Sequence, residues 1–284
     1  MATLLTLKRR IKTASNVSKT TKAMQMIAAS KLKKAQEAAE SSKPYVEKLD
    51  FLSKAIEQKI DKDNLNPYMT AKNDIKTKLF IVISPDKGLC GGMVTNLIRE
   101  ILRLTNNEKA YYITVGKKAE KLVASLNKEI VASFPFGTTL PPFKTVFPIT
   151  KIIDEYFLGN KVSQVLIIST KFNSVFSQEP FSNTILPVKL EENLGQNNSK
   201  TLFEPDVNLL LPDLLQHYLE MVIYQSFLDS FASEQASRMI AMKNATDNAL
   251  DIIEELRLEY NKTRQEKITN ELLDIGGSSQ VAYE

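Results

Sequence analysis

The residue types that carry out most protein chemistry are scarce in this sequence. Cys90 is the only cysteine and His217 the only histidine, so the chain cannot build an internal disulfide, a cysteine metal cluster or a histidine-rich metal site. We expect His217 to be solvated or at the edge of a helix seam. The adjacent acids at 154–155 and 254–255 lie in predicted helices, where neighbours along the chain point in different directions. They therefore do not form a catalytic carboxylate pair.

The run Gly-Leu-Cys-Gly-Gly at positions 88–92 is the most specific local feature of the middle of the chain. It lies between a predicted strand and a predicted helix, where glycines can cradle a phosphate at the helix N-terminus. A nucleotide-binding enzyme is thus one alternative, although the spacing matches neither the Walker motif nor the dinucleotide fingerprint. The simpler interpretation is a structural turn in which Gly88, Gly91 and Gly92 allow positive φ and Cys90 is a small buried side chain.

Positive charge is concentrated at the start of the chain, although the net charge is only +4. From Met1 to Gln36 there are nine lysines or arginines and no acidic residue. A transit peptide is also basic and acid-poor, but here the helical pattern continues past residue 56 without a processing boundary. A nucleic-acid-binding face and a protein partner with an acidic surface both remain possible. The absence of aromatic residues before Tyr45 leaves nothing there to stack on bases.

The elements that position these residues begin with the stretch from Pro212 to Ile275, which contains no glycine and no further proline. At about 1.5 Å per residue it predicts a single helix roughly 95 Å long. Apolar residues recur at alternating spacings of three and four, so one face is a seam for another helix. After Tyr260 the apolar residues move by one position, which predicts a different neighbour for the tip. The seam residues are Leu228, Ala232, Met239, Met242, Thr246, Ala249, Ile253, Leu256 and Tyr260, and the tip residues are Ile268, Leu272 and Ile275.

The first 60 residues supply the partner helix, because the same alternation runs through them without a slip. Alanine and serine dominate the middle of this seam, and such small side chains allow two helices to approach closely. Pro44 lacks an N–H and should kink or loosen the helix. The seam consists of Leu4, Leu7, Ile11, Ala14, Ser18, Thr21, Gln25, Ala28, Leu32, Ala35, Ala39, Ser42, Val46, Leu49, Ser53, Ile56 and Ile60.

The middle of the chain changes from helical to alternating strand and helix patterns. Strands are predicted at 79–84, 111–115, 130–134, 162–170 and 184–190, with helices at 93–104, 117–126 and 149–158. This alternation is typical of a small α/β domain with a largely parallel sheet. The predicted fold is a long antiparallel coiled coil of N- and C-terminal helices (1–60 and 208–276) with an inserted Rossmann-like α/β domain (75–204). No apolar run approaches the ~20 residues that a membrane span requires.

Several motifs together resemble one family, the γ subunit of F-type ATP synthase. They are KAMQMIAASKLKK at 22–34, the glycine-rich turn at 88–92, Glu-Pro-Asp at 204–206, SEQASRMIAMKNATDN at 233–248 and YNKTRQEKITNEL at 260–272. The resemblance runs from one end of the chain to the other. It implies a central rotor shaft that couples rotation of the membrane c-ring to ATP synthesis or hydrolysis on a hexamer of α and β subunits. In this family the chain itself is not catalytic and holds no cofactor or metal.

The resemblance also assigns partner contacts to particular positions of this sequence. Arg238, Gln265 and Thr269 match the residues that form a hydrogen-bonded catch with β subunits. Met24 and Lys22 match the segment that faces the acidic lever loop of β.

At the other end of such a rotor, Glu204 matches a position near the ε subunit and the c-ring. The resemblance implies a peripheral location on the cytoplasmic face of a bacterial inner membrane, with no nucleic-acid partner. The chloroplast-type member carries two redox cysteines, whereas this chain has only Cys90. Redox control of that kind is therefore not expected.

Overall fold

The computed structural model describes residues 3–57, 66–70, 72, 75–105, 109–188 and 207–280. The chain forms two compact units. Unit 1 combines residues 1–27 with 239–284, and unit 2 comprises residues 28–238.

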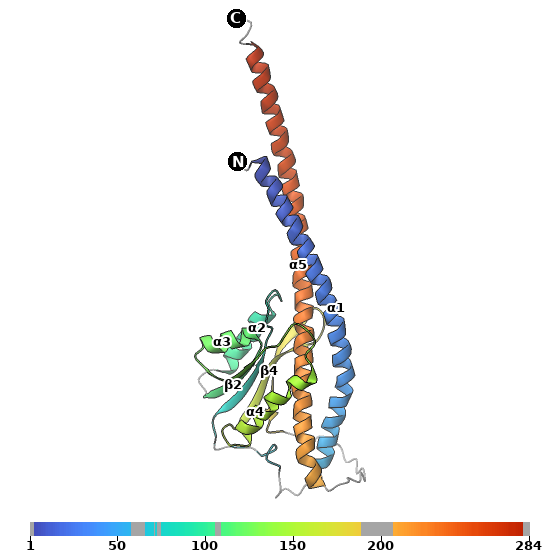
Figure 1. The fold of residues 1–284 in the computed structure, drawn as a ribbon, viewed down its shortest axis with the longest axis vertical. Coiled ribbons are helices and arrows are strands. Elements are labelled where there is room, and N and C mark those ends of the chain that lie inside the picture. The colour runs from blue at the N-terminus through green and yellow to red at the C-terminus, as the bar shows by residue number, and fades with distance from the viewer. Residues whose placement is uncertain are drawn as a thin grey trace. The chain divides into compact units, whose positions relative to one another are not determined.

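Two long helices, α1 (Leu4–Glu57) and α5 (Val207–Gln280), come from the two ends of the chain (Figure 1). Both helices expected from the seam patterns are therefore present. Pro44 lies inside α1, and the helix assignment continues through it, so the predicted loosening does not end the helix. Next to Pro44, the Ser42 hydroxyl donates a 2.6 Å hydrogen bond to Oε1 of Gln225, which ties this part of α1 to α5.

Within unit 1 the segments of α1 and α5 run antiparallel, with Thr21 beside Thr246 (2.7 Å between hydroxyl oxygens) and Thr6 in the same groove as Leu256. Burial follows the predicted seam: on α5 the buried side chains between 239 and 273 are Met242, Thr246, Ala249 and Ile253. The remaining positions of that stretch are half-buried or exposed, so each helix of unit 1 buries one narrow face.

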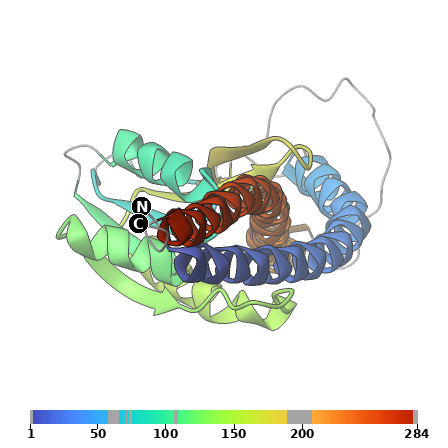
Figure 2. The same ribbon diagram turned by 90° about the horizontal axis from the view of Figure 1, so that it is seen from above.

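Within unit 2 the two helices are also antiparallel, since Ser42 bonds Gln225 whereas Tyr45 bonds His217 (2.9 Å), further back along α5. In both views α1 and α5 lie side by side (Figure 1 and Figure 2). Ala28, Leu32 and Ala35 are buried on α1 as the seam predicts. On α5, every residue from 227 to 236 except Asp229 is buried, so this segment is covered on all sides.

A five-stranded sheet forms the centre of unit 2, in the order β3-β2-β1-β4-β5. Its strands are β1 (Lys78–Ile83), β2 (Ala110–Val115), β3 (Glu129–Phe134), β4 (Gln164–Phe172) and β5 (Gln178–Leu186). The first four strands pair in parallel, as predicted, and β5 pairs antiparallel with β4.

The predicted extent of the last strand, 184–190, is wrong. β5 begins at Gln178 and pairs as far as Phe172↔Gln178. Its early positions alternate between half-buried and exposed, as is normal for an edge strand, and the polar residues and Pro180 there hide the strand signal. Positions 189 and 190 lie outside the described residues.

Short helices cover the sheet: α2 (Met93–Leu104), α3 (Lys117–Ser125), the 3₁₀ turn η2 (Phe143–Thr145) and α4 (Phe147–Phe157). One core layer forms where α2 and α3 meet β1, β2 and β4. It contains Phe80, Val82, Leu97, Ile101, Tyr112, Val123 and Ile168. On α5, Ser233 donates to the carbonyl of Thr170 at 3.4 Å, which anchors this helix to β4.

Candidate functional site

Arg238 on α5 and the glycine-rich turn at 88–92 meet in unit 2. Arg238 Nη2 lies 2.6 Å from Oε1 of Glu234 and donates to the carbonyl of Gly88 at 3.3 Å. The side chain of Arg238 is 12% exposed and that of Glu234 only 3%. Two of the predicted site positions are thus joined by a hydrogen bond, and Glu234, which is not among the predicted positions, completes the cluster.

Electrostatics in this cluster are set by burial and by the ion pair. Burial raises the pKa of Glu234, and the positive charge of Arg238 opposes that shift. At 2.6 Å we take the carboxylate as ionised and paired, because a neighbouring guanidinium is always charged. Burial also raises the pKa of the nearby Cys90 thiol, with Arg238 again opposing. Cys90 is therefore a protonated, poorly reactive thiol at neutral pH.

The conformation of the 88–92 turn differs in detail from the prediction. Positive φ falls at Leu89 (65°) and Gly91 (54°), whereas Gly92 has φ −80°. A Cβ on Gly88 or Gly92 would meet nothing within 4 Å. Of the three glycines, only Gly91 is required by its backbone conformation, and Leu89 holds an uncommon one without that help. The expectation that Cys90 is buried is confirmed.

Asp86 anchors the start of the same loop. Its Oδ1 accepts the backbone N–H of Lys117 at 2.9 Å, and its Oδ2 accepts that of Gly137 at 2.8 Å. Nearby, the Lys31 ammonium donates to the carbonyl of Thr138 at 2.6 Å. The bonds to Asp86 tie the loops after β1, β2 and β3 together, and the bond from Lys31 attaches the last of these loops to α1. Sequence reasoning missed Asp86 and Glu234, although the i,i+4 spacing of Glu234 and Arg238 was a usable signal.

The other selected positions of the long helices lie on their surfaces. Gln265 and Thr269 are exposed on α5, one turn apart, and the Thr269 hydroxyl donates to the carbonyl of Gln265 at 3.0 Å. On α1, Lys22 is exposed and Met24 half-buried. Glu204 and the side chain of Ile275 lie outside the described residues.

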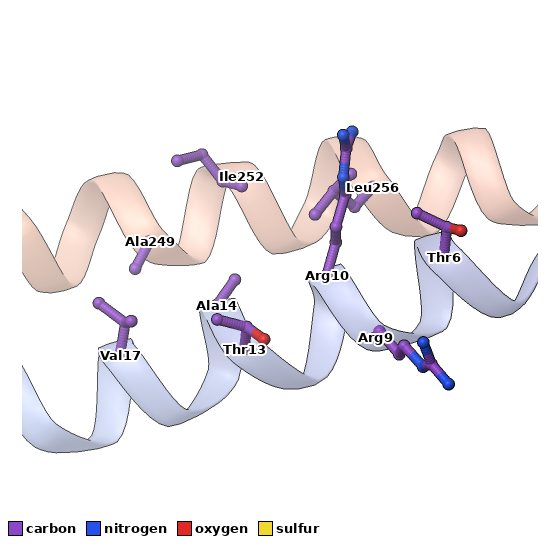
Figure 3. Close-up of a pocket in the computed structure, with 9 residues that line it drawn as sticks. All are labelled: Thr6, Arg9, Arg10, Thr13, Ala14, Val17, Ala249, Ile252 and Leu256. Carbon is purple, nitrogen blue, oxygen red and sulfur yellow. The ribbon is translucent and has the colours of Figure 1, made fainter. Parts of the chain in front are cut away.

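A groove of about 520 Å³ runs between α1 and α5 in unit 1 (Figure 3). Its walls are largely apolar, and Figure 3 shows Arg10 extending from α1 alongside Leu256 of α5. The lining consists of Thr6, Arg9, Arg10, Thr13, Ala14, Val17, Ala249, Ile252 and Leu256. It is an apolar surface edged by positive charge.

His217 contacts groups from both long helices of unit 2. The Tyr45 hydroxyl lies 2.9 Å from its Nε2, and Glu220 Oε2 lies 3.4 Å from its Nδ1. This placement fits the expectation of a position at the edge of the helix seam. Among the described residues, no three His, Cys, Asp or Glu side chains are grouped to hold a metal ion. None of the helices described is long and apolar enough to cross a bilayer.

Long helices from the two ends of the chain pair with each other, and an α/β domain is inserted between them in the sequence. This is the architecture that the sequence motifs predict for a γ subunit. A family model described as ATP synthase matches residues 3–280. The chain belongs to the ATP synthase gamma chain family. It is 38% identical over 285 residues to the ATP synthase gamma chain of Dehalococcoides mccartyi, covering 99% of this chain and all of that one. It is 38% identical to the gamma chain of Paracidovorax citrulli, with 94% of each chain covered.

Solved structures show the same fold. The central stalk and c-ring structure of the Tetrahymena thermophila mitochondrial ATP synthase contains a chain with a TM-score of 0.60 and 27% identity, covering 79% of this chain and 98% of that chain. A rotor chain of the Euglena gracilis mitochondrial ATP synthase has a TM-score of 0.67 with 93% and 98% covered. At 17% identity, the second match bears on the fold alone.

Proposed function

We propose that this chain is the non-catalytic rotor shaft of an F-type ATP synthase, coupling rotation of the c-ring to ATP synthesis or hydrolysis on the hexamer of α and β subunits. The observation that carries the proposal is the nearly end-to-end similarity to relatives named ATP synthase gamma chain. No cofactor is assigned to the chain, because the nucleotide sites of such a machine belong to the hexamer.

Residues 1–60 and 208–276 act as an antiparallel coiled coil, and residues 75–204 as a Rossmann-like foot. The alternating three-four burial on α5 from Met242 to Ile253 supports the coiled coil. The parallel order of β3, β2, β1 and β4 supports the foot. Torque passes along the two long helices, whose buried seam residues include Ala28, Ala35 and Ala249.

Contacts with β subunits fall to the polar residues of the two helices. Gln265 and Thr269 are exposed on α5 and present an amide and a hydroxyl to a partner. Both described contacts of Arg238 use Nη2, so the N–H groups of Nε and Nη1 can each donate to a separate acceptor on β. Lys22, together with Met24, faces the acidic lever loop, where its charge steers the encounter. The tip of α5, where Ile268, Leu272 and Leu273 are exposed, supplies an apolar bearing surface with few directional bonds.

The foot contacts the ε subunit and the c-ring, with Glu204 among the contact residues. Because the c-ring lies in the membrane, we place the chain peripherally on the cytoplasmic face of a bacterial inner membrane. Attachment through protein partners agrees with the absence of a membrane-spanning helix among the residues described.

Reconstitution tests this proposal. We expect the chain to co-purify stoichiometrically with α and β subunits, and Arg238→Ala to assemble yet lower steady-state ATP turnover at matched subunit content. The combined Gln265→Ala and Thr269→Ala variant should lose more turnover than either single variant. Lys121→Ala, an exposed position on α3, is the matched control and should turn over normally.

Two experimental outcomes would favour an alternative function, a nucleic-acid adaptor or a nucleotide-binding enzyme, over the rotor. Salt-sensitive binding of the isolated chain to DNA or RNA would indicate a nucleic-acid adaptor. Saturable nucleotide binding that is lost on changing Gly91 and Gly92 would indicate an enzyme.

A further inference from the structure

In the ion pair between Glu234 and Arg238, one carboxylate oxygen is buried without a partner in the described part of the chain, and a purely stabilising role for the pair does not explain this. Glu234 is 2% exposed, and only Oε1 contacts Arg238. Its second oxygen, Oε2, is buried and has no hydrogen-bond partner among the described residues. A buried carboxylate that leaves one oxygen unpaired is a poor stabilising device, since desolvation of the pair offsets most of its attraction. Such a group in a native structure calls for another explanation.

The turn that this pair contacts holds a strained conformation. Leu89 has φ 65° although it is not a glycine, and it is 62% exposed, so its own side chain packing does not hold it there. Backbone in this region persists only where its surroundings impose it. Asp86 fixes the start of the loop through Lys117 and Gly137. The first residue of the turn is held by the bond from Arg238 to the Gly88 carbonyl.

We propose that Glu234 is a positioning residue for Arg238, and that Glu234, Arg238 and the Gly88 carbonyl form a latch that holds the 88–92 turn against α5. The latch keeps the side chain of Cys90, a residue of this turn, buried. A carboxylate that competes for the guanidinium releases the Gly88 carbonyl and with it the turn. This release step rests on the proposed function, in which the carboxylate belongs to a β subunit, whereas the latch itself is a property of the isolated chain.

The geometry of arginine makes the competition specific. Nη2 serves Glu234 and Gly88 together, and both bidentate forks of a guanidinium, Nε with Nη2 and Nη1 with Nη2, include this nitrogen. A second carboxylate that binds bidentately therefore displaces Glu234 or the Gly88 carbonyl from Nη2. Lysine has a single nitrogen and cannot hold both sets of acceptors in one plane. Arg238→Lys therefore preserves charge and loses the latch.

The isolated chain provides the first test, with Cys90, its only cysteine, as the reporter. We measure the rate at which an uncharged maleimide labels the folded chain, for Glu234→Gln, Arg238→Ala and both together. Each single variant should label at least tenfold faster, with the labelling profile shifted to lower pH because the exposed thiol loses the effect of burial. The double variant should label no faster than the faster single variant, since both changes open the same latch.

Two controls separate the latch from general destabilisation. Asp213→Asn removes an exposed carboxylate from the same helix and should leave the labelling rate unchanged. Phe157→Ala opens the core of unit 2 near the start of β4, whereas the turn follows the end of the parallel strand β1. The latch variants must label faster than Phe157→Ala even when their free energy of unfolding is equal to or higher than that of Phe157→Ala. Wild-type labelling in either single variant, or additive rates in the double variant, would overturn the latch.

The assembled complex provides the second test. Glu234→Gln should lower ATP turnover to the level of Arg238→Ala, with no further loss in the double variant. Unchanged turnover in Glu234→Gln, alongside fast Cys90 labelling in the isolated chain, would remove the β-driven release and retain the latch. Failure to assemble any complex with wild-type chain would instead reject the rotor function.

Discussion

The same two helices are held in different ways in unit 1 and unit 2. In unit 1 the buried positions of α5 are Met242, Thr246, Ala249 and Ile253, one narrow seam with the rest of the surface uncovered. In unit 2 nearly every residue from Phe227 to Ala236 is buried, because the helix also packs against the sheet. Burial on all sides makes a helix segment intolerant of change, whereas a single seam leaves most positions free for contacts with other molecules.

The largest expected effect is the difference in unfolding free energy between truncating a buried side chain of α5 in unit 2 and truncating an exposed side chain of α5 in unit 1. Phe231 on α5 is 1% exposed, and Phe231→Ala should lower the free energy of unfolding by about 3 to 5 kcal/mol through lost transfer energy and a cavity. Leu258, on the unit 1 segment of the same helix, is 67% exposed. Leu258→Ala should therefore change the free energy of unfolding by less than about 0.5 kcal/mol. Urea unfolding of both variants measures the difference, and equal costs would break the comparison.

The next effect concerns the backbone of unit 2. Gly116 has φ 96°, and a Cβ there would lie 1.9 Å from the carbonyl oxygen of Ser84. Gly116→Ala should therefore cost about 3 kcal/mol, combining left-handed strain with overpacking. Gly137 has φ 84° but open space around it, so Gly137→Ala should cost only the strain, about 1 to 2 kcal/mol.

Gly92 is the matched control for these two glycines, since it has neither positive φ nor a close neighbour. Gly92→Ala should leave the denaturation midpoint within error of the wild-type value. If Gly116→Ala behaves in the same way, the close approach of Gly116 to the Ser84 carbonyl is not as described.

A smaller effect is expected from the polar contact in the seam of unit 1. Thr21 and Thr246 share a hydrogen bond of 2.7 Å across the helices, and the Thr246 hydroxyl is also 2.8 Å from the Met242 carbonyl. Without the bond between them, Thr21 can still donate to the Ser18 carbonyl and Thr246 to the Met242 carbonyl. Losing the bond across the helices should therefore lower the free energy of unfolding by only about 0.5 to 1.5 kcal/mol. A double-mutant cycle with Thr21→Ala and Thr246→Ala measures the coupling, and zero coupling would show that the seam holds through packing alone.

The smallest expected effect is a pH dependence confined to unit 2. Burial raises the pKa of Asp154, outweighing the hydrogen bond of 2.7 Å that it accepts from the Tyr68 hydroxyl, and the negative charge of Glu220 raises it further. The folded state therefore binds this proton more tightly than the unfolded state. The contribution of this proton to the free energy of unfolding is fully present below the usual aspartate pKa of about 3.9. It is lost as the pH rises through the pKa that Asp154 has in the folded state.

Asp154→Asn removes this contribution, so between pH 4 and pH 7 the wild type should lose more unfolding free energy than the variant. Denaturant titrations at the two pH values give the comparison, with Asp213→Asn as an exposed control on α5. A pH dependence unaffected by Asp154→Asn would place its origin elsewhere in the chain.

Local pattern determined the long helices and most of the sheet. The alternation of three and four predicts which residues of α1 and α5 are buried, from Leu7 on one helix to Ile253 on the other. Helix seams and buried strands can be predicted in this way because their periodicity is written in neighbouring residues. For the polar edge strand β5, the sequence pattern predicts a start at residue 184, whereas the strand begins at Gln178. The reason is that an exposed edge lacks the apolar run that marks a buried strand.

Contacts between distant parts of the chain were decided only by the tertiary structure. The bond from Arg238 to the Gly88 carbonyl joins residues 150 positions apart, and the bond from the Gly137 N–H to Asp86 spans 51 positions. Nothing in the local sequence specifies these partners, because each donor and acceptor is chosen by which loops the packed sheet brings to one edge. The i,i+4 spacing of Glu234 and Arg238 can be read from the sequence, but only the fold shows that this pair is buried and that Arg238 reaches Gly88.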